Sequence, residues 1–158
     1  SVFDLASRTL RHTITVGERP FGISVGPQGR IFTADVGSNC VTVVDPETGQ
    51  IIGTVPVGER PYAISFAAGS GFVTNQYADT VSVFGLEDLK VHATRDVGEY
   101  PEGIDASADG SRIVVANWFS NSVSVIDTMT LKVIAEIETG DGPRAFGRFL
   151  APGFGEEK

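Results

Sequence analysis

The stretch Val16-Gly17-Glu18-Arg19-Pro20 decides the fold of this chain, because close copies of it return three more times. The copies are Val57-Gly58-Glu59-Arg60-Pro61, Val97-Gly98-Glu99-Tyr100-Pro101 and Thr139-Gly140-Asp141-Gly142-Pro143. Their prolines follow one another at intervals of 41, 40 and 42 residues. A fixed period of this length indicates a repeat protein, in which neighbouring units stack to build one continuous core.

Composition indicates an all-β protein. The 158 residues amount to one domain, and 41% hydrophobic residues with 19 glycines suit short strands joined by tight turns. The net charge of −8 would repel phosphate backbones, which argues against nucleic acid as a partner. No apolar run approaches the ~20 residues of a membrane-spanning helix, and the first residues show no signal-like pattern.

Each repeat predicts four short strands, called a, b, c and d. In the first unit they span 21–25, 30–35, 41–44 and 51–57. Strand c alternates valine with small polar residues, so one of its faces is apolar. A four-stranded sheet cannot bury such a face alone, and radial stacking of successive sheets gives a β-propeller of antiparallel blades. A flat solenoid is the alternative, but solenoids with one strand per rung use shorter repeats.

The repeat boundaries place one β-propeller region at 1–150 and a tail at 151–158. Within that region we expect a partial blade at 1–16, full repeats of about 41 residues at 17–57, 58–97 and 98–139, and a closing strand in 140–150. The partial blade contributes strands c and d, the three full repeats contribute twelve strands and the closing strand is one more, so fifteen strands are expected. They make a half-propeller or a small ring. Because an unclosed ring leaves an open blade face and unpaired edges, we expect another segment, a protein partner or a second copy to complete it.

Several motifs resemble one known family. Val73-Thr74-Asn75, Val115-Ala116-Asn117, the run from Asn121 to Asp127 and the repeated Gly-x-x-Pro are similar to the YVTN-type β-propeller repeat. That family includes surface-layer proteins, periplasmic binding proteins and propellers similar to lactonases and amine dehydrogenases. The resemblance implies the propeller fold and a periplasmic or extracellular location, but it does not settle the activity.

The candidate binding residues gather on one face of the expected propeller. The d-to-a and b-to-c loops emerge together on this face, which we call the loop face, and they are rich in arginine and aromatic residues, as recognition surfaces are. The candidates are Arg19, Asp35, Arg60, Asn75, Tyr77, Tyr100, Asn117, Trp118, Phe119 and Arg144. The repetition of the pairs Glu18-Arg19 and Glu59-Arg60 favours a structural role for them in contacts between blades. Trp118-Phe119 departs from the repeat, which favours either ligand binding or packing against a neighbouring blade or subunit.

The sequence predicts no catalytic residue, metal site or cofactor. His12 and His92 fall in strand d, the outermost strand, far from any acid or nucleophile in the channel. Cys40 is the only cysteine and lies in no metal-binding motif. Asp35 and Asp105 are a conceivable pair near the channel, although this sequence uses aspartate freely in turns.

Two functions remain open from the sequence. The first is a non-catalytic binding or scaffold module that recognises a protein or small ligand through its loop face. The alternative is a propeller subunit of an enzyme similar to amine dehydrogenase heavy chains or lactonases, with its cofactor or catalytic residues elsewhere. The absence of an acid/base pair or metal motif favours the first.

Overall fold

The computed structural model describes residues 1–151, which form fourteen β-strands and one short 3₁₀ turn, η1 (Pro27–Gly29). Of the tail predicted at 151–158, all but Ala151 lies outside the described residues. Residues 1–151 contain no helix with the length and hydrophobicity needed to cross a membrane.

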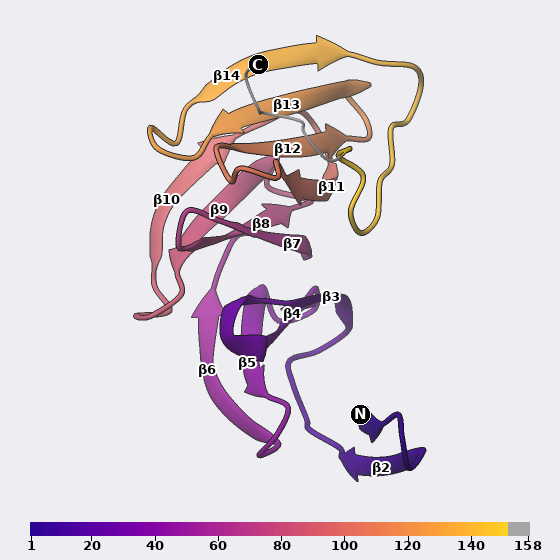
Figure 1. Cartoon of the computed structure of the whole chain (residues 1–158). Helices are drawn as coiled ribbons and strands as arrows, with labels where there is room; N and C mark the ends of the chain where they lie inside the picture. Colours follow the sequence, from indigo (N-terminus) through magenta and orange to yellow (C-terminus); the bar gives the residue numbers. More distant parts are fainter. Residues whose placement is uncertain (152–158) are drawn as a thin grey trace.

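Twelve of the strands form three four-stranded antiparallel sheets, each in chain order. The first holds β3 (Pro20–Val25), β4 (Ile31–Asp35), β5 (Cys40–Asp45) and β6 (Gln50–Pro56). The second holds β7 (Pro61–Ala67), β8 (Ser70–Asn75), β9 (Thr80–Gly85) and β10 (Val91–Asp96). The third holds β11 (Pro101–Ala106), β12 (Arg112–Asn117), β13 (Ser122–Asp127) and β14 (Val133–Glu138). The predicted all-β class and four-stranded antiparallel blades are confirmed, and Figure 1 shows the sheets stacked in succession.

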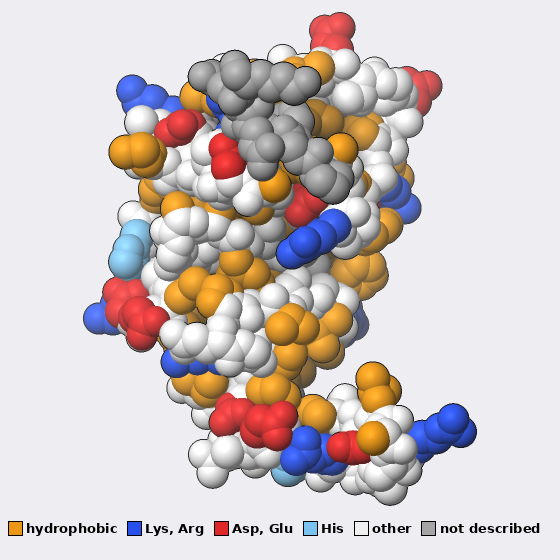
Figure 2. Space-filling view, viewed as in Figure 1, with side chains coloured by type: hydrophobic (Ala, Val, Ile, Leu, Met, Phe, Trp, Pro, Cys, Tyr) orange, Lys and Arg blue, Asp and Glu red, His pale blue; other side chains and the backbone are white. Residues whose placement is uncertain are grey.

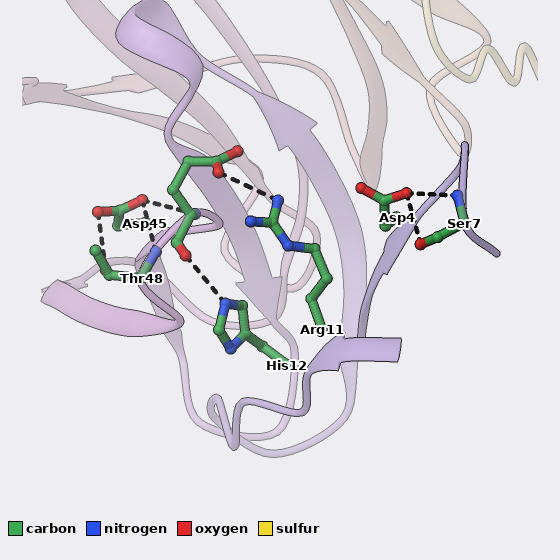
Figure 3. Close-up of polar contacts among 7 residues, drawn as sticks. Asp4, Ser7, Arg11, His12, Asp45 and Thr48 are labelled. Carbon is green, nitrogen blue, oxygen red and sulfur yellow. Dashed lines mark hydrogen bonds and ion pairs between the residues drawn. The ribbon is translucent and has the colours of Figure 1, made fainter. Parts of the chain in front are cut away.

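The remaining two strands form a hairpin, β1 (Val2–Asp4) with β2 (Thr9–His12), at the lower end of the molecule in Figure 1. Its turn repeats the turn between β5 and β6. The Ser7 hydroxyl donates to Asp4 Oδ1 at 2.8 Å, as the Thr48 hydroxyl donates to Asp45 Oδ2 at 2.8 Å (Figure 3). The hairpin is therefore the c-and-d pair of a preceding blade, as the sequence predicts.

Two contacts attach this hairpin to the first sheet. Arg11 Nη1 lies 3.2 Å from Glu47 Oε2, and His12 Nε2 lies 3.0 Å from the carbonyl oxygen of Glu47 (Figure 3). His12 thus contacts the outer turn of the next blade. His92 also lies on an outer strand, β10, where Nε2 is 2.8 Å from Asp88 Oδ2.

The core lies between the sheets. One buried cluster joins the first sheet to the second, and another joins the second to the third. Strand-c valines such as Val41, Val43 and Val81 are fully buried in these clusters. The period-two alternation of strand c therefore marks the face that packs on the neighbouring blade.

The closing strand predicted within 140–150 does not form as a strand in the structure. Its path is nevertheless that of a strand a. A Cβ added to Gly103 in β11 would lie 2.3 Å from the Ala145 carbonyl oxygen, just as one added to Gly22 in β3 would lie 2.2 Å from the Tyr62 carbonyl oxygen. The segment follows β11 as β7 follows β3, but the described residues supply no strand b with which it can form a ladder.

The first sheet leaves hydrophobic side chains open to solvent. Phe21, Ile23 and Val25 on β3 are 54%, 72% and 70% exposed, and Phe3 and Leu10 on the hairpin are also exposed. Figure 2 shows hydrophobic side chains at the surface over the lower part of the molecule, where these elements lie. The described residues supply no strands a and b to pair with the hairpin and cover this apolar face.

Candidate functional site

A repeated left-handed turn shapes each d-to-a loop. The residue before each repeated proline has a positive φ, namely 50° at Arg19, 54° at Arg60, 57° at Tyr100 and 62° at Gly142. In the last three turns, the amide of this residue donates to a side-chain oxygen of the preceding b-to-c loop. The acceptors are Asn39, Asp79 and Asn121, at 2.9, 2.8 and 2.8 Å respectively. These bonds offset the strain of a non-glycine residue at positive φ and fix the direction of its side chain.

The b-to-c loops are fastened to the same turns by backbone bonds. The Trp118 amide donates to the Tyr100 carbonyl at 3.0 Å, and the Phe119 amide donates to the Glu99 carbonyl at 3.2 Å. Gln76 makes the equivalent bond to Arg60 at 2.9 Å. The two kinds of loop therefore emerge side by side, as predicted for the loop face, and their side chains meet.

A cavity of about 430 Å³ opens between these loops, and we call it the loop-face pocket. It is lined by Arg19, Pro20, Phe21, Val36, Arg60, Tyr62, Gln76, Tyr100, Glu102, Trp118 and Arg144. Its size falls within the ~300–1,000 Å³ typical of small-molecule sites. Five of the ten sequence-predicted residues line it, namely Arg19, Arg60, Tyr100, Trp118 and Arg144.

The most deeply placed polar group of the pocket is the carboxylate of Glu102, on β11, which is 1% exposed. Gln76 Nε2 donates to its Oε1 at 2.8 Å, and Arg144 Nε lies 3.1 Å from its Oε2. Burial raises the pKa of Glu102, while the positive charge of Arg144 and the Gln76 bond oppose that rise. The Arg144 side chain is 44% exposed, so it contacts both the buried Glu102 carboxylate and the solvent.

Four aromatic rings beside the pocket form one cluster around Tyr100. The centre of the Tyr100 ring lies 5.4 Å from that of Tyr77, 5.4 Å from that of Trp118 and 4.3 Å from that of Phe119. Hydrogen bonding with Tyr77, and then burial, raise the pKa of Tyr100. Spacings of this kind are typical of attractive aromatic pairs, so the cluster forms a rigid wall.

Two arginines stack on this wall. The guanidinium carbon of Arg144 lies 3.6 Å from the centre of the Trp118 ring, and that of Arg60 lies 4.2 Å from the centre of the Tyr77 ring. Stacking holds each guanidinium flat against an aromatic face while its N–H edge stays free to donate. The arrangement is suited to binding a planar partner that accepts hydrogen bonds.

A second pair of aromatic rings, from the first and second blades, also lines the pocket. Tyr62 stacks on Phe21 with ring centres 4.1 Å apart, and the Phe146 ring lies 6.3 Å from each of them. Burial is the main cause that raises the pKa of Tyr62. Phe21 and Tyr62 line the loop-face pocket, whereas Phe146 contacts them from outside its lining.

Asp35, Asn75 and Asn117 occupy equivalent positions at the ends of strands b, and all three are fully buried. Their side chains bond to strand c of the same blade. Asp35 accepts from the Thr42 hydroxyl at 2.5 Å, while Asn75 and Asn117 donate to Ser82 and Ser124, both at 2.9 Å. A ligand in the loop-face pocket would not meet these groups, because none of the three lines it. They stabilise each blade by joining the end of strand b to strand c.

Sequence reasoning missed Glu102, Tyr62 and Phe21 as pocket residues. All three directly follow a repeated proline, where the fourth repeat has Arg144. The signal was available, since this position changes chemistry from one blade to the next while its neighbours repeat. Such variation within a repeat marks side chains that the blade itself does not require.

Asp35 and Asp105 belong to different blades and do not form a pair. Asp105 Oδ2 instead accepts hydrogen bonds from the amides of Phe149 and Leu150, each at 2.8 Å.

Cys40 begins β5, where it is buried and donates to Asp35 at 3.6 Å, and burial raises the pKa of its thiol. Residues 1–151 hold no group of three metal-ligating side chains placed to bind one ion.

Comparison with solved structures identifies the architecture. Hydrazine synthase of Kuenenia stuttgartiensis superposes with a TM-score of 0.78 and 32% identity, over 85% of this chain and 40% of that chain. The chain is a partial β-propeller. Virginiamycin B lyase of Staphylococcus aureus gives a TM-score of 0.69 at 17% identity, over 79% of this chain and 44% of that chain. A catalytically inactive variant of that lyase with quinupristin gives 0.67 at 17% identity, over 77% and 41%.

The chain spans less than half the length of each of these propeller proteins. No protein-family model matches the sequence, and no curated protein sequence matches it. The similarity at 17% identity bears on the fold alone, whereas hydrazine synthase is also similar in sequence, at 32% identity. These comparisons support an incomplete propeller that resembles the propellers of enzymes, without assigning an activity.

Proposed function

We propose that this chain is the ligand-binding part of a non-catalytic β-propeller, and that it recognises a small ligand or a protein through the loop-face pocket. The observation that carries the proposal is the convergence of three blades on one cavity of about 430 Å³. Buried Glu102, stacked Arg144 and the Tyr100 cluster give that cavity a fixed shape and fixed hydrogen-bonding groups. Rigid aromatic walls with a few oriented polar groups are what small-molecule sites have in common.

The proposal includes a structural condition, which is that additional blades complete the ring. The apolar side chains of β3 are exposed, and residues 143–150 form no ladder with another strand. Further strands, from more of the same protein or from a second copy, would cover this face and pair with this segment. We also propose a periplasmic or extracellular location, on the strength of the YVTN-like motifs. Cell fractionation with an antibody against the chain tests this location, and a cytoplasmic signal would reject it.

A thermal-shift screen of a diverse small-molecule collection tests the proposed function. A ligand present at 100 times its Kd stabilises the folded state by about 2.7 kcal/mol, which raises Tm by about 5 °C or more. We expect some compounds to raise Tm in the wild type and to lose that effect in Trp118→Ala. Phe3→Ala, which removes an exposed ring of the hairpin, is the matched control and should respond as the wild type does. Compounds that stabilise Trp118→Ala equally well would contradict a role for the pocket.

One observation favours a second function, that of an enzyme subunit. The 32% identity to hydrazine synthase extends over 85% of this chain, and the name of that protein is the name of an enzyme. In that case the chain shapes a site whose cofactor or catalytic residues belong to another part of the assembly. Visible absorbance spectroscopy and metal analysis of the native protein distinguish the two, since a stoichiometric cofactor would place the enzyme subunit first.

A further inference from the structure

The loop-face pocket carries an excess of positive charge on an acidic protein. Its lining contains Arg19, Arg60 and Arg144 but one acid, Glu102, although the whole chain has a net charge of −8. The acids of the same d-to-a loops, Glu18, Glu59, Glu99 and Asp141, are exposed and do not line the pocket. Overall charge is screened beyond ~8 Å at physiological ionic strength, so the local charge of the lining decides what binds.

The one acid of the pocket is already paired with an arginine, although its Oε2 accepts no hydrogen bond within residues 1–151. Glu102 receives a hydrogen bond from Gln76 at 2.8 Å and has Arg144 Nε at 3.1 Å. A cationic ligand would therefore have to displace Arg144 while it approached two further arginines. Positive ligands are disfavoured on both counts.

Arg60, in contrast, lacks an acceptor. Its Nε is buried and makes no hydrogen bond within residues 1–151, and its guanidinium carbon lies 4.2 Å from the centre of the Tyr77 ring. No side-chain hydrogen bond of Arg60 is present within residues 1–151, so its guanidinium would gain from an acceptor that reaches its outer N–H groups. Arg144 likewise uses its Nε for Glu102 and its face for Trp118, so the outer edge of its guanidinium remains available.

We propose that the loop-face pocket binds an aromatic carboxylate, with its anionic oxygens on Arg60 and Arg144 and its ring among Phe21, Tyr62, Tyr100 and Trp118. This inference rests on the proposed function, to which it adds the class of ligand. A guanidinium edge matches the two oxygens of a carboxylate, and the pocket presents two such edges beside aromatic walls. Neutral ligands would leave both donors without a charged acceptor.

Isothermal titration calorimetry of the native protein with five probes tests the inference. The probes are benzoate, neutral benzamide, cationic benzylamine, acetate and inorganic phosphate. We expect benzoate to bind about tenfold or more tightly than any of the other four, because a hydrogen bond to a charged group and a stacked ring contribute together. Arg60→Gln and Arg144→Gln should each weaken benzoate binding by about tenfold, whereas Arg11→Gln, on the hairpin, should leave it unchanged.

The other outcomes separate this inference from the proposed function. Phosphate binding as tightly as benzoate would mean a simple oxyanion site and would overturn the aromatic ligand. If benzamide, benzylamine or another compound binds through Trp118 while benzoate does not, the ligand class is wrong and loop-face recognition stands. Benzoate affinity that is equal in wild type, Arg60→Gln and Arg60→Lys would overturn the inference, provided that all three proteins show the same Tm before ligand is added.

Discussion

The guanidinium carbon of Arg144 lies 3.6 Å from the centre of the Trp118 ring, so the segment after the last sheet contacts the loop between β12 and β13. The same guanidinium places Nε 3.1 Å from the buried Glu102 carboxylate. One side chain thus joins the aromatic cluster to the most buried acid of the pocket. The loop-face pocket depends on residues from beyond the third blade as well as from within it.

Removing this side chain should loosen the pocket. We expect Arg144→Ala to lower the free energy of unfolding by about 1–2 kcal/mol, since it removes a cation–π contact and leaves Glu102 with one partner, while partial exposure limits the loss. Urea denaturation measures the change, and the emission of Trp118, the only tryptophan in the sequence, should shift as its ring loses its cover. Arg11→Ala, which breaks an exposed pair with Glu47, should cost less than about 0.5 kcal/mol. An equal loss in both variants would contradict the account.

The buried side chains at the ends of strands b, Asp35, Asn75 and Asn117, can be compared with one another by mutation. Asn75→Ala should destabilise the protein by about 1–3 kcal/mol, because Thr80 and Ser82 lose a buried partner. Asn75→Asp should cost less, since the equivalent Asp35 of the first blade accepts the Thr42 hydroxyl in the same place. Chemical denaturation compares the two variants. If aspartate proves as damaging as alanine, the equivalence of the two positions fails.

The repeated proline phrase and the alternation in strand c were enough to predict the fold. They predicted three four-stranded sheets, and in the first unit, for which strand bounds were predicted, the strand ends differ from the structure by at most one residue, because turn chemistry and burial act locally in each blade. The prediction of a closing strand within 140–150 was wrong, and the local sequence could not have shown why. A strand needs a paired neighbour, and the strand b that would pair with this segment is absent from the residues described.

Close backbone approach between blades gives a third prediction. A Cβ added to Gly22 would lie 2.2 Å from the Tyr62 carbonyl oxygen, so Gly22→Ala forces β3 and β7 apart and should cost about 1–3 kcal/mol. Gly140→Ala is the matched control, because no atom lies within 4 Å of the added Cβ there. Thermal unfolding of the two variants should separate them clearly. A neutral Gly22→Ala would show that the blades are not packed as described.

The candidate site was less predictable than the fold. Topology alone brought Arg60, Tyr100, Trp118 and Arg144 to one face, and the structure joins them around one cavity. Topology does not say whether a polar side chain at a strand end points to the loops or toward the next strand, which is why Asp35 was grouped with them. Glu102 was overlooked because a carboxylate just inside a strand is usually exposed, whereas here Gln76 and Arg144 make its burial tolerable.

The turn between β11 and β12 gives a pH-dependent prediction. Hydrogen bonds from the Ser107 hydroxyl, and then from the amide and hydroxyl of Ser111, lower the pKa of Asp109 from 3.8 to about 2. A lowered pKa in the folded state adds stability that is fully present above pH 3.8 and is lost as pH falls through about 2. Wild type should therefore be more stable than Asp109→Asn at pH 5, and the difference should shrink toward pH 2. Denaturant titrations across this range check it, and a constant difference would exclude the carboxylate as the cause.

The molar mass of the native protein in solution, measured by light scattering, tests the central claim that these residues are an incomplete propeller. The sequence alone amounts to 16.7 kDa. Because β3 exposes its apolar face and the segment after β14 lacks a strand partner, we expect the particle to have a mass well above this value, through further blades of a longer chain or a second copy. A stably folded monomer of 16.7 kDa would contradict the claim, since the ring would then have to close within the residues shown.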